Sequence, residues 1–298
     1  MNLSCLHTHT TFCDGEDDVE TFCRAAKEKN LHSLGFSAHA PITKKTGFVT
    51  GWHLGDDRLE EYLDAIRSAK KRWKGRLNIY AGLEADFIDG LTGPADREYR
   101  EMGLDYLIGS VHYLVPPKGK PFTVDGPPEE FARGVGESYG GDGEAAMGAY
   151  WDTLEKMIAA GGFDILGHAD LIRKNNGDDQ WFDIESKNYL ERLSRIALLI
   201  GLQQHIVTEV NTGGLNRGKI KDTYPSPAFL KLLAQGAQGT SVQGALAPVI
   251  ITADAHRAKD LNGHYTLAKE TLRRAGFKET LLFEGRENGR PRWTPRPL

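Results

Sequence analysis

Short apolar segments alternate with amphipathic segments of helical periodicity along the chain of 298 residues. The segments expected to form strands are 2–6, 34–41, 77–83, 106–111, 163–167, 205–210 and 249–253. The segments expected to form helices are 19–26, 57–73, 145–160, 184–200, 227–233 and 261–275. This alternation predicts a parallel α/β sheet with helical crossovers, and about seven such units favour a closed barrel over an open sheet.

Three stretches fall outside this alternation. The segment 113–143 is rich in Pro and Gly, and we expect a long, partly helical excursion that either folds over a substrate or is an idle surface segment. The Gly-rich segment 236–246 is expected to be a surface loop, and 280–293 a closing strand or hairpin. No linker divides the chain, so residues 1–298 are interpreted as a single domain.

Polar side chains stand at the carboxyl ends of the predicted strands. They are His39, Glu84, His112, His168, Asn211, Asp254 and His256. In a barrel of parallel strands these ends converge on one face, where active sites are built. Chance placement would scatter the histidines over helices and loops as well, so the pattern predicts a functional site at this face.

The first predicted strand leads into His7 and His9, which are two positions apart. Side chains at i and i+2 of a strand point to the same face, so both imidazoles can reach one point. Asp14 can return a carboxylate to the same place, with Gly15 easing the turn. Two imidazoles and a carboxylate suit a divalent ion such as zinc, iron or manganese, although a His-x-His in an ordinary surface turn is an equal alternative when taken alone.

Taken together, nine groups are candidate metal ligands, although a single such histidine is more often a core or turn residue. They are His7, His9, Asp14, His39, Glu84, His112, His168, Asp254 and His256. Because zinc usually takes four ligands, nine imply about two to three divalent transition metal ions with at least one bridging carboxylate. His53 could line the same pocket, but its position in a loop favours a surface role.

The bulk composition excludes several classes of protein. The net charge of −4 gives no reason to expect nucleic acid or a membrane surface as a partner. The three cysteines all lie within the first 23 residues, which is no disulfide framework and indicates a reducing compartment. No leader pattern opens the sequence, and no apolar run approaches the ~20 residues that cross a bilayer. We therefore expect a soluble, cytoplasmic protein.

The combined motifs resemble those of the polymerase and histidinol phosphatase (PHP) superfamily, and most of all its monofunctional histidinol-phosphatase branch. The motifs are His-Thr-His (7–9), Gly-Phe-Ser-Ala-His-Ala-Pro (35–41), Gly-Leu-Glu-Ala-Asp-Phe (82–87), Ile-Gly-Ser-Val-His (108–112), Asp-Ile-Leu-Gly-His-Ala-Asp-Leu-Ile-Arg-Lys (164–174), Glu-Val-Asn-Thr (209–212) and Ala-Asp-Ala-His (253–256). The resemblance implies a distorted TIM-like (β/α)7 barrel with a trinuclear metal centre. By this analogy His7, His9, Glu84 and Asp254 hold one ion, Glu84, His112 and His168 a second, and Asp14, His39 and His256 a third.

Basic residues near these motifs are candidates for binding an anionic substrate. Arg173, in the loop after His168, is the first candidate to neutralise a phosphate through its planar fork, with an ion pair to a neighbouring acid as the alternative. Arg217 and Lys219 are further candidates. The family usually carries Arg directly after its Asn-Thr-x-Gly-Leu segment, whereas this chain has Asn216 before Arg217.

The expected chemistry is in-line attack of a metal-bridging hydroxide on a phosphomonoester. Asp254 or His256 could relay a proton to the leaving alkoxide. The resemblance implies L-histidinol phosphate as the substrate, which places the enzyme in histidine biosynthesis. Another small phosphomonoester, a phosphodiester and a non-catalytic metal-binding module remain as alternatives.

Overall fold

The computed structural model describes residues 3–203, 205–236 and 247–298. In this part of the chain, seven parallel strands form one sheet in the order β1-β2-β3-β4-β7-β8-β9. Their bounds are β1 Ser4–Cys5, β2 Ser33–His39, β3 Asn78–Asp86, β4 Tyr106–Ser110, β7 Ile165–Leu166, β8 Val207–Asn211 and β9 Val249–Thr252. The ring closes just beyond β1 and β9, where His9 donates a backbone hydrogen bond to Ala255 and Ala255 donates one to His7. The predicted barrel of parallel strands is confirmed.

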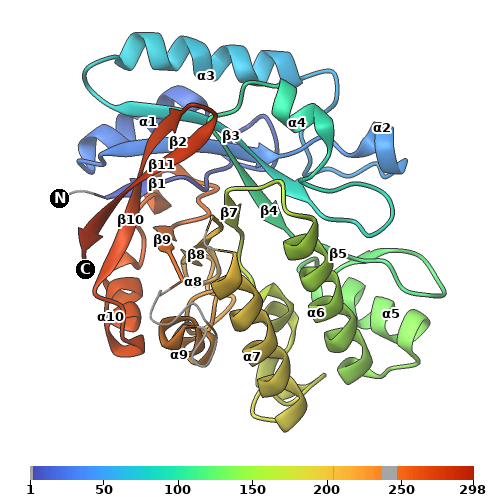
Figure 1. Ribbon diagram of the computed structural model, residues 1–298. Coiled ribbons are helices and arrows are strands. Elements are labelled where there is room, and N and C mark those ends of the chain that lie inside the picture. Colours follow the sequence, from blue (N-terminus) through green and yellow to red (C-terminus); the bar gives the residue numbers. More distant parts are fainter. Residues whose placement is uncertain (1–2, 204, 237–246) are drawn as a thin grey trace.

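Helices cover the outer face of the barrel (Figure 1). The α-helices are α1 Val19–Glu28, α2 Thr43–Thr46, α3 Leu59–Trp73, α4 Arg97–Glu101, α5 Pro128–Tyr139, α6 Gly143–Ala160, α7 Lys187–Leu202, α8 Gly213–Asn216, α9 Pro227–Gln235 and α10 Tyr265–Ala275. Short 3-10 helices are η1 Leu171–Asn175, η2 Gly177–Asp179 and η3 Ala258–Asp260. All six helices expected from periodicity are present, with ends that differ by a few residues.

The first helix illustrates why these segments form helices. Asp18 caps α1 by accepting a hydrogen bond of 2.7 Å from the backbone N–H of Thr21, which satisfies a donor that the helix leaves free. Val19, Phe22, Cys23 and Ala26 then fall on one face, and all are buried. The spacing of i, i+3, i+4 and i+7 turns that face toward the barrel.

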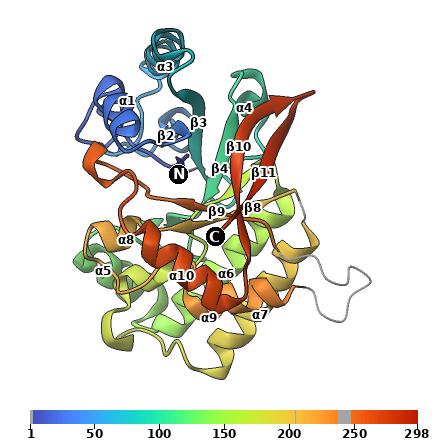
Figure 2. The same cartoon turned by 90° about the vertical axis from the view of Figure 1, so that its left-hand side faces the viewer.

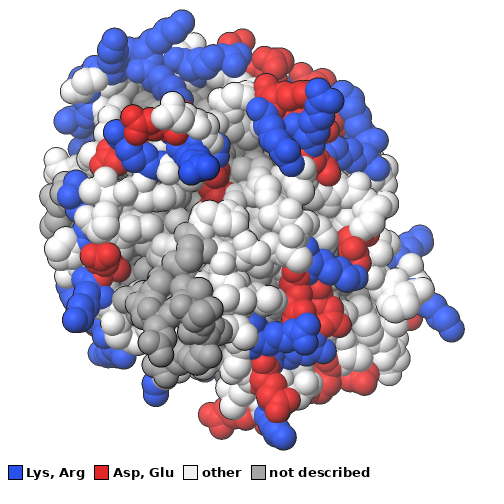
Figure 3. Space-filling view, in the orientation of Figure 1, with Lys and Arg blue, Asp and Glu red and all other residues white. Residues whose placement is uncertain are grey.

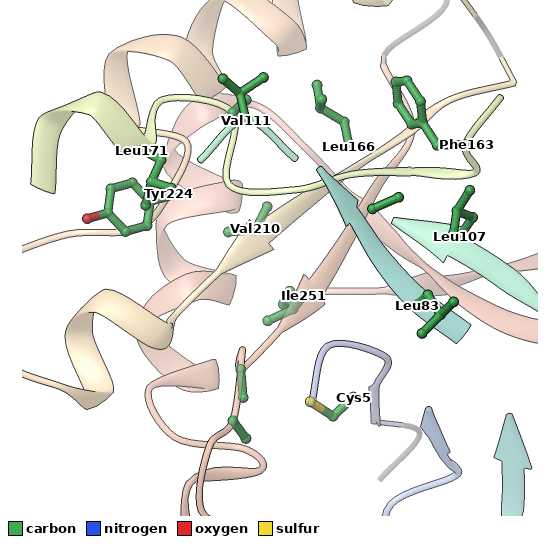
Figure 4. Packing of buried hydrophobic residues seen from close by; sticks show 14 of the residues in the cluster. Cys5, Leu83, Leu107, Val111, Phe163, Leu166, Leu171, Val210, Tyr224 and Ile251 are labelled. Carbon is green, nitrogen blue, oxygen red and sulfur yellow. The ribbon is translucent and has the colours of Figure 1, made fainter. Parts of the chain in front are cut away.

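Alternation along the strands divides the buried residues into two layers. Leu83, Leu107, Leu166, Val210 and Ile251 point outward from five neighbouring strands and pack beneath the helices (Figure 4). The residues next to them in sequence point into the barrel, where Ile108, Ile165 and Ile250 join a separate apolar cluster, because successive side chains of a strand alternate in direction. Glu84 and Glu209 occupy the same inward phase nearer the carboxyl ends of their strands and are fully buried.

Tyr106 fills the middle of the barrel. Its hydroxyl donates to the carbonyl oxygens of Leu6 at 2.5 Å and Phe36 at 3.1 Å. Gly35 and Gly82 lie directly against the ring, and a Cβ atom at either position would collide with it. The two glycines therefore allow one large aromatic side chain to tie β1 and β2 to β4 from inside.

The C-terminal segment forms a hairpin of β10 Glu279–Glu287 and β11 Arg290–Pro297, in agreement with the expected closing strand or hairpin (Figure 2). Phe283 of this hairpin has no exposed surface, and its ring lies 4.8 Å from that of Tyr80 and 5.7 Å from that of Tyr106. The hairpin thus closes the amino-terminal end of the barrel, opposite the face that carries the predicted site.

The long excursion expected at 113–143 is partly helical. It contains a small antiparallel pair, β5 Tyr113–Leu114 and β6 Phe122–Thr123, followed by α5. The Gly-rich segment 236–246 lies outside the described residues from position 237 onward.

The described helices include none that is long and apolar enough to cross a membrane. On the face shown in Figure 3, basic and acidic side chains are interspersed around a broad area of other residues. Several exposed charges form pairs within one helix, such as Arg67 with Asp64 and Arg97 with Glu101. Such exposed pairs contribute little to stability.

The hairpin contact predicts a stability effect that is separate from activity. Phe283→Ala should lower the free energy of unfolding by about 3–5 kcal/mol, because it removes a large side chain from a closed core. Denaturant unfolding at fixed metal concentration measures this, with half-buried Leu281→Ala as the milder control. Activity of the folded fraction should be unchanged, and a large loss of turnover would contradict a purely structural role.

Candidate metal centre

All nine candidate ligands lie together at the carboxyl-terminal mouth of the barrel. His7, His9 and Asp14 follow β1, His39 ends β2, Glu84 lies in β3, His112 follows β4, His168 follows β7, and Asp254 and His256 follow β9. Among the described residues they form four overlapping groups whose ligand atoms lie within 4.8 Å of one another. Segments that are distant in sequence therefore meet at one place, as expected for the ends of parallel strands.

Glu84 stands between two of these groups. Its Oε2 atom lies 3.1 Å from Nε2 of His7 and 3.0 Å from Nδ1 of His39. Its Oε1 atom lies 2.9 Å from Nε2 of His168 and 3.5 Å from Nε2 of His112. Glu84 therefore belongs to two of the four groups and could offer one oxygen atom to each.

A second carboxylate, Asp14, faces the outer part of the cluster. It lies 3.0 Å from Nε2 of His256, 3.6 Å from Nδ1 of His9 and 3.8 Å from Nε2 of His39. Asp254 completes the inner part, with Oδ1 3.2 Å from Nε2 of His9. The three carboxylates thus divide the imidazoles into adjoining sets of mixed nitrogen and oxygen donors, which suit zinc, iron or manganese.

Several buried nitrogen and oxygen atoms of this cluster lie close to one another, yet they make no hydrogen bond of good geometry with any described residue. They are Nε2 of His7, Nε2 of His9, Nδ1 of His39, Nδ1 of His168 and Oε2 of Glu84. Leaving buried polar atoms unsatisfied is costly, and native proteins rarely do so without a ligand or ion. The residues present therefore fit divalent metal ions.

The electrostatics of the cluster agree with this interpretation. Burial alone would lower the pKa of His112, but the carboxylates of Asp86 and Glu84 outweigh it and raise that pKa to about 10. Burial and the imidazoles of His256 and His39 lower the pKa of His9 to about 3. Metal ligands bind in the deprotonated form, so an ion that binds at His112 has to displace its proton.

Asp86 holds His112 in place from behind. Its Oδ1 atom accepts a hydrogen bond of 2.7 Å from Nδ1 of His112, which leaves Nε2 to face the cluster. Its Oδ2 atom lies 2.7 Å from Nε2 of His53. His53 is therefore a buried support of the site, and the surface role expected from its loop position is wrong. Outer carboxylates of this kind orient ligating histidines and raise their basicity.

Glu209 plays the same part for His7. Its Oε2 atom lies 2.8 Å from Nδ1 of His7, and it also accepts a bond of 2.7 Å from the hydroxyl of Thr252. Its Oε1 atom accepts the backbone N–H of His168 at 2.6 Å. Glu209 was not among the candidate ligands. Because Val210 points outward and side chains of a strand alternate, the sequence does indicate that Glu209 points into the barrel.

A cavity of about 500 Å³ opens above the cluster. Seven of the candidate ligands line its floor, and Phe48, Trp52 and Tyr113 form an aromatic wall. Trp52 and Tyr113 stack with ring centroids 5.7 Å apart. A small molecule can enter this space and reach the candidate metal ligands.

Two basic side chains line this cavity. Arg217 donates to Oδ2 of Asp254 at 3.0 Å, and Lys174 pairs with Oδ2 of Asp125 at 3.3 Å. Lys174 was not among the candidates for substrate binding, although it directly follows Arg173 on η1. Both cations are thus held by acids within reach of the cavity.

Arg173, the first candidate for binding a phosphate, is not among the described residues that line the cavity above the cluster. Its Nε atom lies 3.1 Å from Oδ2 of Asp170, and its Nη2 atom donates to Asp222 at 2.6 Å and to the carbonyl of Thr223 at 2.9 Å. The contacts with Asp222 and Thr223 tie η1 to the segment before α9. Lys219 lies with Arg173 at a separate, smaller cavity of about 240 Å³. Acidic partners thus hold Arg173 outside the cavity above the cluster, and Lys219 lines the smaller cavity.

Barrel and cluster together define a protein with a candidate multinuclear metal centre at the mouth of a parallel barrel. The PHP domain model matches residues 6–213, which is more than half of the chain. The chain therefore belongs to the PHP domain family.

Relatives of similar length carry related names. The Deinococcus radiodurans protein named "Probable histidinol-phosphatase" is 26% identical over 282 residues, covering 94% of this chain and 96% of its own. The Bacillus subtilis "Histidinol-phosphatase" is 26% identical over 274 residues, covering 87% of this chain and 95% of its own.

Two solved structures share the fold. A Listeria monocytogenes structure named "putative histidinol phosphatase" superimposes with a TM-score of 0.75 at 26% identity, covering 88% of this chain and 99% of its own. A histidinol phosphate phosphatase from Lactococcus lactis, solved with zinc, L-histidinol and phosphate, gives a TM-score of 0.65 at 19% identity, covering 98% and 99%.

The contact between Asp86 and His112 predicts an effect on metal affinity. Asp86→Asn should weaken metal binding by about 10- to 100-fold, since it removes the carboxylate that orients a ligating imidazole. Competition with a fluorescent zinc chelator measures the affinity. Asp89→Asn, which removes an exposed acid three residues further along, is the control and should bind metal normally. Equal affinity in both variants would remove Asp86 from the account.

Proposed function

We propose that this protein is a metal-dependent phosphomonoesterase that hydrolyses L-histidinol phosphate to L-histidinol and phosphate, a step of histidine biosynthesis. The observation that carries the proposal is the meeting of nine imidazole and carboxylate groups at the mouth of the barrel, where seven of them line the floor of one cavity. The substrate is inferred from relatives at 26% identity that are named histidinol-phosphatase and match most of the chain. We take residues 1–298 as one such phosphatase domain.

We propose that the nine residues hold about two to three divalent ions of zinc, iron or manganese. When bound, such ions supply an activated water near neutral pH and positive charge for the phosphoryl group. Glu84 fixes the spacing of the cluster because it contacts imidazoles on both of its sides. Asp86 and Glu209 keep His112 and His7 in the orientation that presents their free nitrogens.

The remaining cations of the cavity act on the phosphate. Arg217 and Lys174 are placed to neutralise its oxygens, and each is kept in position by an acid. Asp254 and His256 are the proposed carriers of a proton to the leaving alkoxide, since both line the cavity beside Arg217.

A phosphate-release assay tests the proposal directly. The protein is stripped with a chelator, reconstituted separately with zinc, iron and manganese, and given L-histidinol phosphate, other small phosphomonoesters and a phosphodiester. We expect turnover only with metal, and the highest kcat/KM for L-histidinol phosphate. A higher kcat/KM for another ester would replace the substrate, and no turnover of any ester by fully loaded protein would favour a non-catalytic metal-binding module.

Removal of one proposed ligand should separate chemistry from folding. His112→Ala should lower kcat by more than about a hundredfold, beyond the loss typical for an outer-shell residue, while circular dichroism shows an intact barrel. His205→Ala, an exposed histidine before β8, serves as the control and should keep full activity. Normal turnover of His112→Ala at saturating metal would contradict the proposed second ion site.

Adjacent residues of η1 should differ in their effects. Lys174→Ala should raise KM by about tenfold, because it removes a cation from the cavity. Arg173→Ala should instead lower the free energy of unfolding by about 3–5 kcal/mol and leave KM unchanged, since it strands the buried Asp170. Steady-state kinetics and denaturant unfolding of both variants measure this. A raised KM for Arg173→Ala with unchanged stability would restore Arg173 as the phosphate ligand.

A further inference from the structure

The cavity carries two carboxylates that belong to neither the metal cluster nor its outer supports. Asp125 follows β6, and Glu130 lies in the first turn of α5. Both line the wall formed by the excursion after β4, next to Phe122 and Thr123. Carboxylates would repel the phosphate group of a substrate, so phosphate binding does not explain the presence of these two acids.

The two acids differ in what they contact. Asp125 is paired with Lys174, which also donates to its backbone carbonyl. Glu130 accepts a hydrogen bond of 3.1 Å from the hydroxyl of Thr123. Within the described part of the chain, no Lys, Arg or His pairs with Glu130, although it is only partly exposed. The cavity wall therefore holds a carboxylate without a cationic partner.

The helix that carries Glu130 offers one explanation for a carboxylate at this position. An acid in the first turn of a helix is stabilised by the helix dipole. Glu129 occupies the same turn and shares this benefit, yet it is exposed and does not line the cavity. The helix dipole therefore explains neither why Glu130 faces the cavity nor why it has no cationic partner.

We propose that Glu130 is a specificity-determining residue that receives the ammonium group of an amine-bearing phosphomonoester. This rests on the proposed function, because it assigns the other end of the same substrate site. The anionic end of the substrate lies at the metal cluster with Arg217 and Lys174, and the cationic end lies at the wall of α5. A dipolar molecule thus meets both cations and an unpaired carboxylate in the lining of one cavity.

The rest of the cavity suits such a molecule. The aromatic wall of Phe48, Trp52 and Tyr113 offers flat apolar surface for the part of the substrate between or beside the charged groups. Asp125 is already neutralised by Lys174, so Glu130 is the carboxylate that is free to form a charge-assisted hydrogen bond. Glu130 touches no reacting atom and acts on recognition alone.

The test compares esters that differ only in the amine. Phosphoethanolamine and propyl phosphate are nearly isosteric, and L-histidinol phosphate is assayed beside them. Wild type should prefer phosphoethanolamine, and Glu130→Gln should raise KM for both amine-bearing esters by about tenfold, the size of one charge-assisted hydrogen bond. The constants for propyl phosphate should stay the same, because Gln retains the shape of the side chain and can still accept from Thr123.

Two further variants separate recognition from structure. Glu129→Gln has the same effect on the helix dipole and should leave all constants unchanged. Glu130→Asp keeps the charge and should restore part of the preference for the amine, which covers the case in which Glu130→Gln fails to fold. Equal losses on all three esters, no loss on any, or the same loss from Glu129→Gln would each overturn the assignment.

The two proposals fail in different ways. If wild type does not hydrolyse L-histidinol phosphate but prefers phosphoethanolamine to propyl phosphate through Glu130, the substrate is wrong and the ammonium site stands. If wild type hydrolyses L-histidinol phosphate and Glu130→Gln shows no selective loss, the function stands and the ammonium site is wrong.

Discussion

The organisation of this protein depends on one buried carboxylate. Glu84 has no exposed surface, yet it contacts imidazoles that follow or end four different strands, those of His7, His39, His112 and His168. A buried charge is tolerated only where opposite charge and hydrogen bonds compensate it. Burial would raise the pKa of Glu84, but the surrounding imidazoles hold it well below its usual range. The mouth of the barrel is therefore built around the negative charge of Glu84, which favours the binding of cations.

The barrel separates this charge from the part that provides stability. Apolar side chains, Tyr106 and the C-terminal hairpin fill its amino-terminal half, and the candidate metal ligands lie in its carboxyl-terminal half. Glu209 and Asp86 lie between the two and hold imidazoles from behind. Loops above the cluster then line the cavity, so they can shape substrate recognition without contributing candidate metal ligands.

Much of this arrangement could be predicted from the sequence, because two periodicities decide it. Alternation of strands and helices implied a parallel barrel, and the geometry of such a barrel brings strand ends such as His39 and His168 together. The orientation of side chains outside the regular strands and helices could not be predicted in this way. Arg173 and Lys174 are neighbours on a short 3-10 turn, and nothing in their order tells which one faces the cavity. The partner of His53 is Asp86, 33 positions away. Because His53 lies in a loop, no periodic pattern shows which way its side chain points.

The central claim is that the nine clustered residues bind the metal ions on which hydrolysis depends. The most direct measurement is anomalous diffraction at the zinc edge from crystals of the active, zinc-loaded protein, together with elemental analysis of the same sample. We predict about two to three peaks of anomalous density per chain, all among these nine residues and with Glu84 between two of them. Less than one ion per chain in active protein, or ions bound elsewhere on the surface, would contradict it.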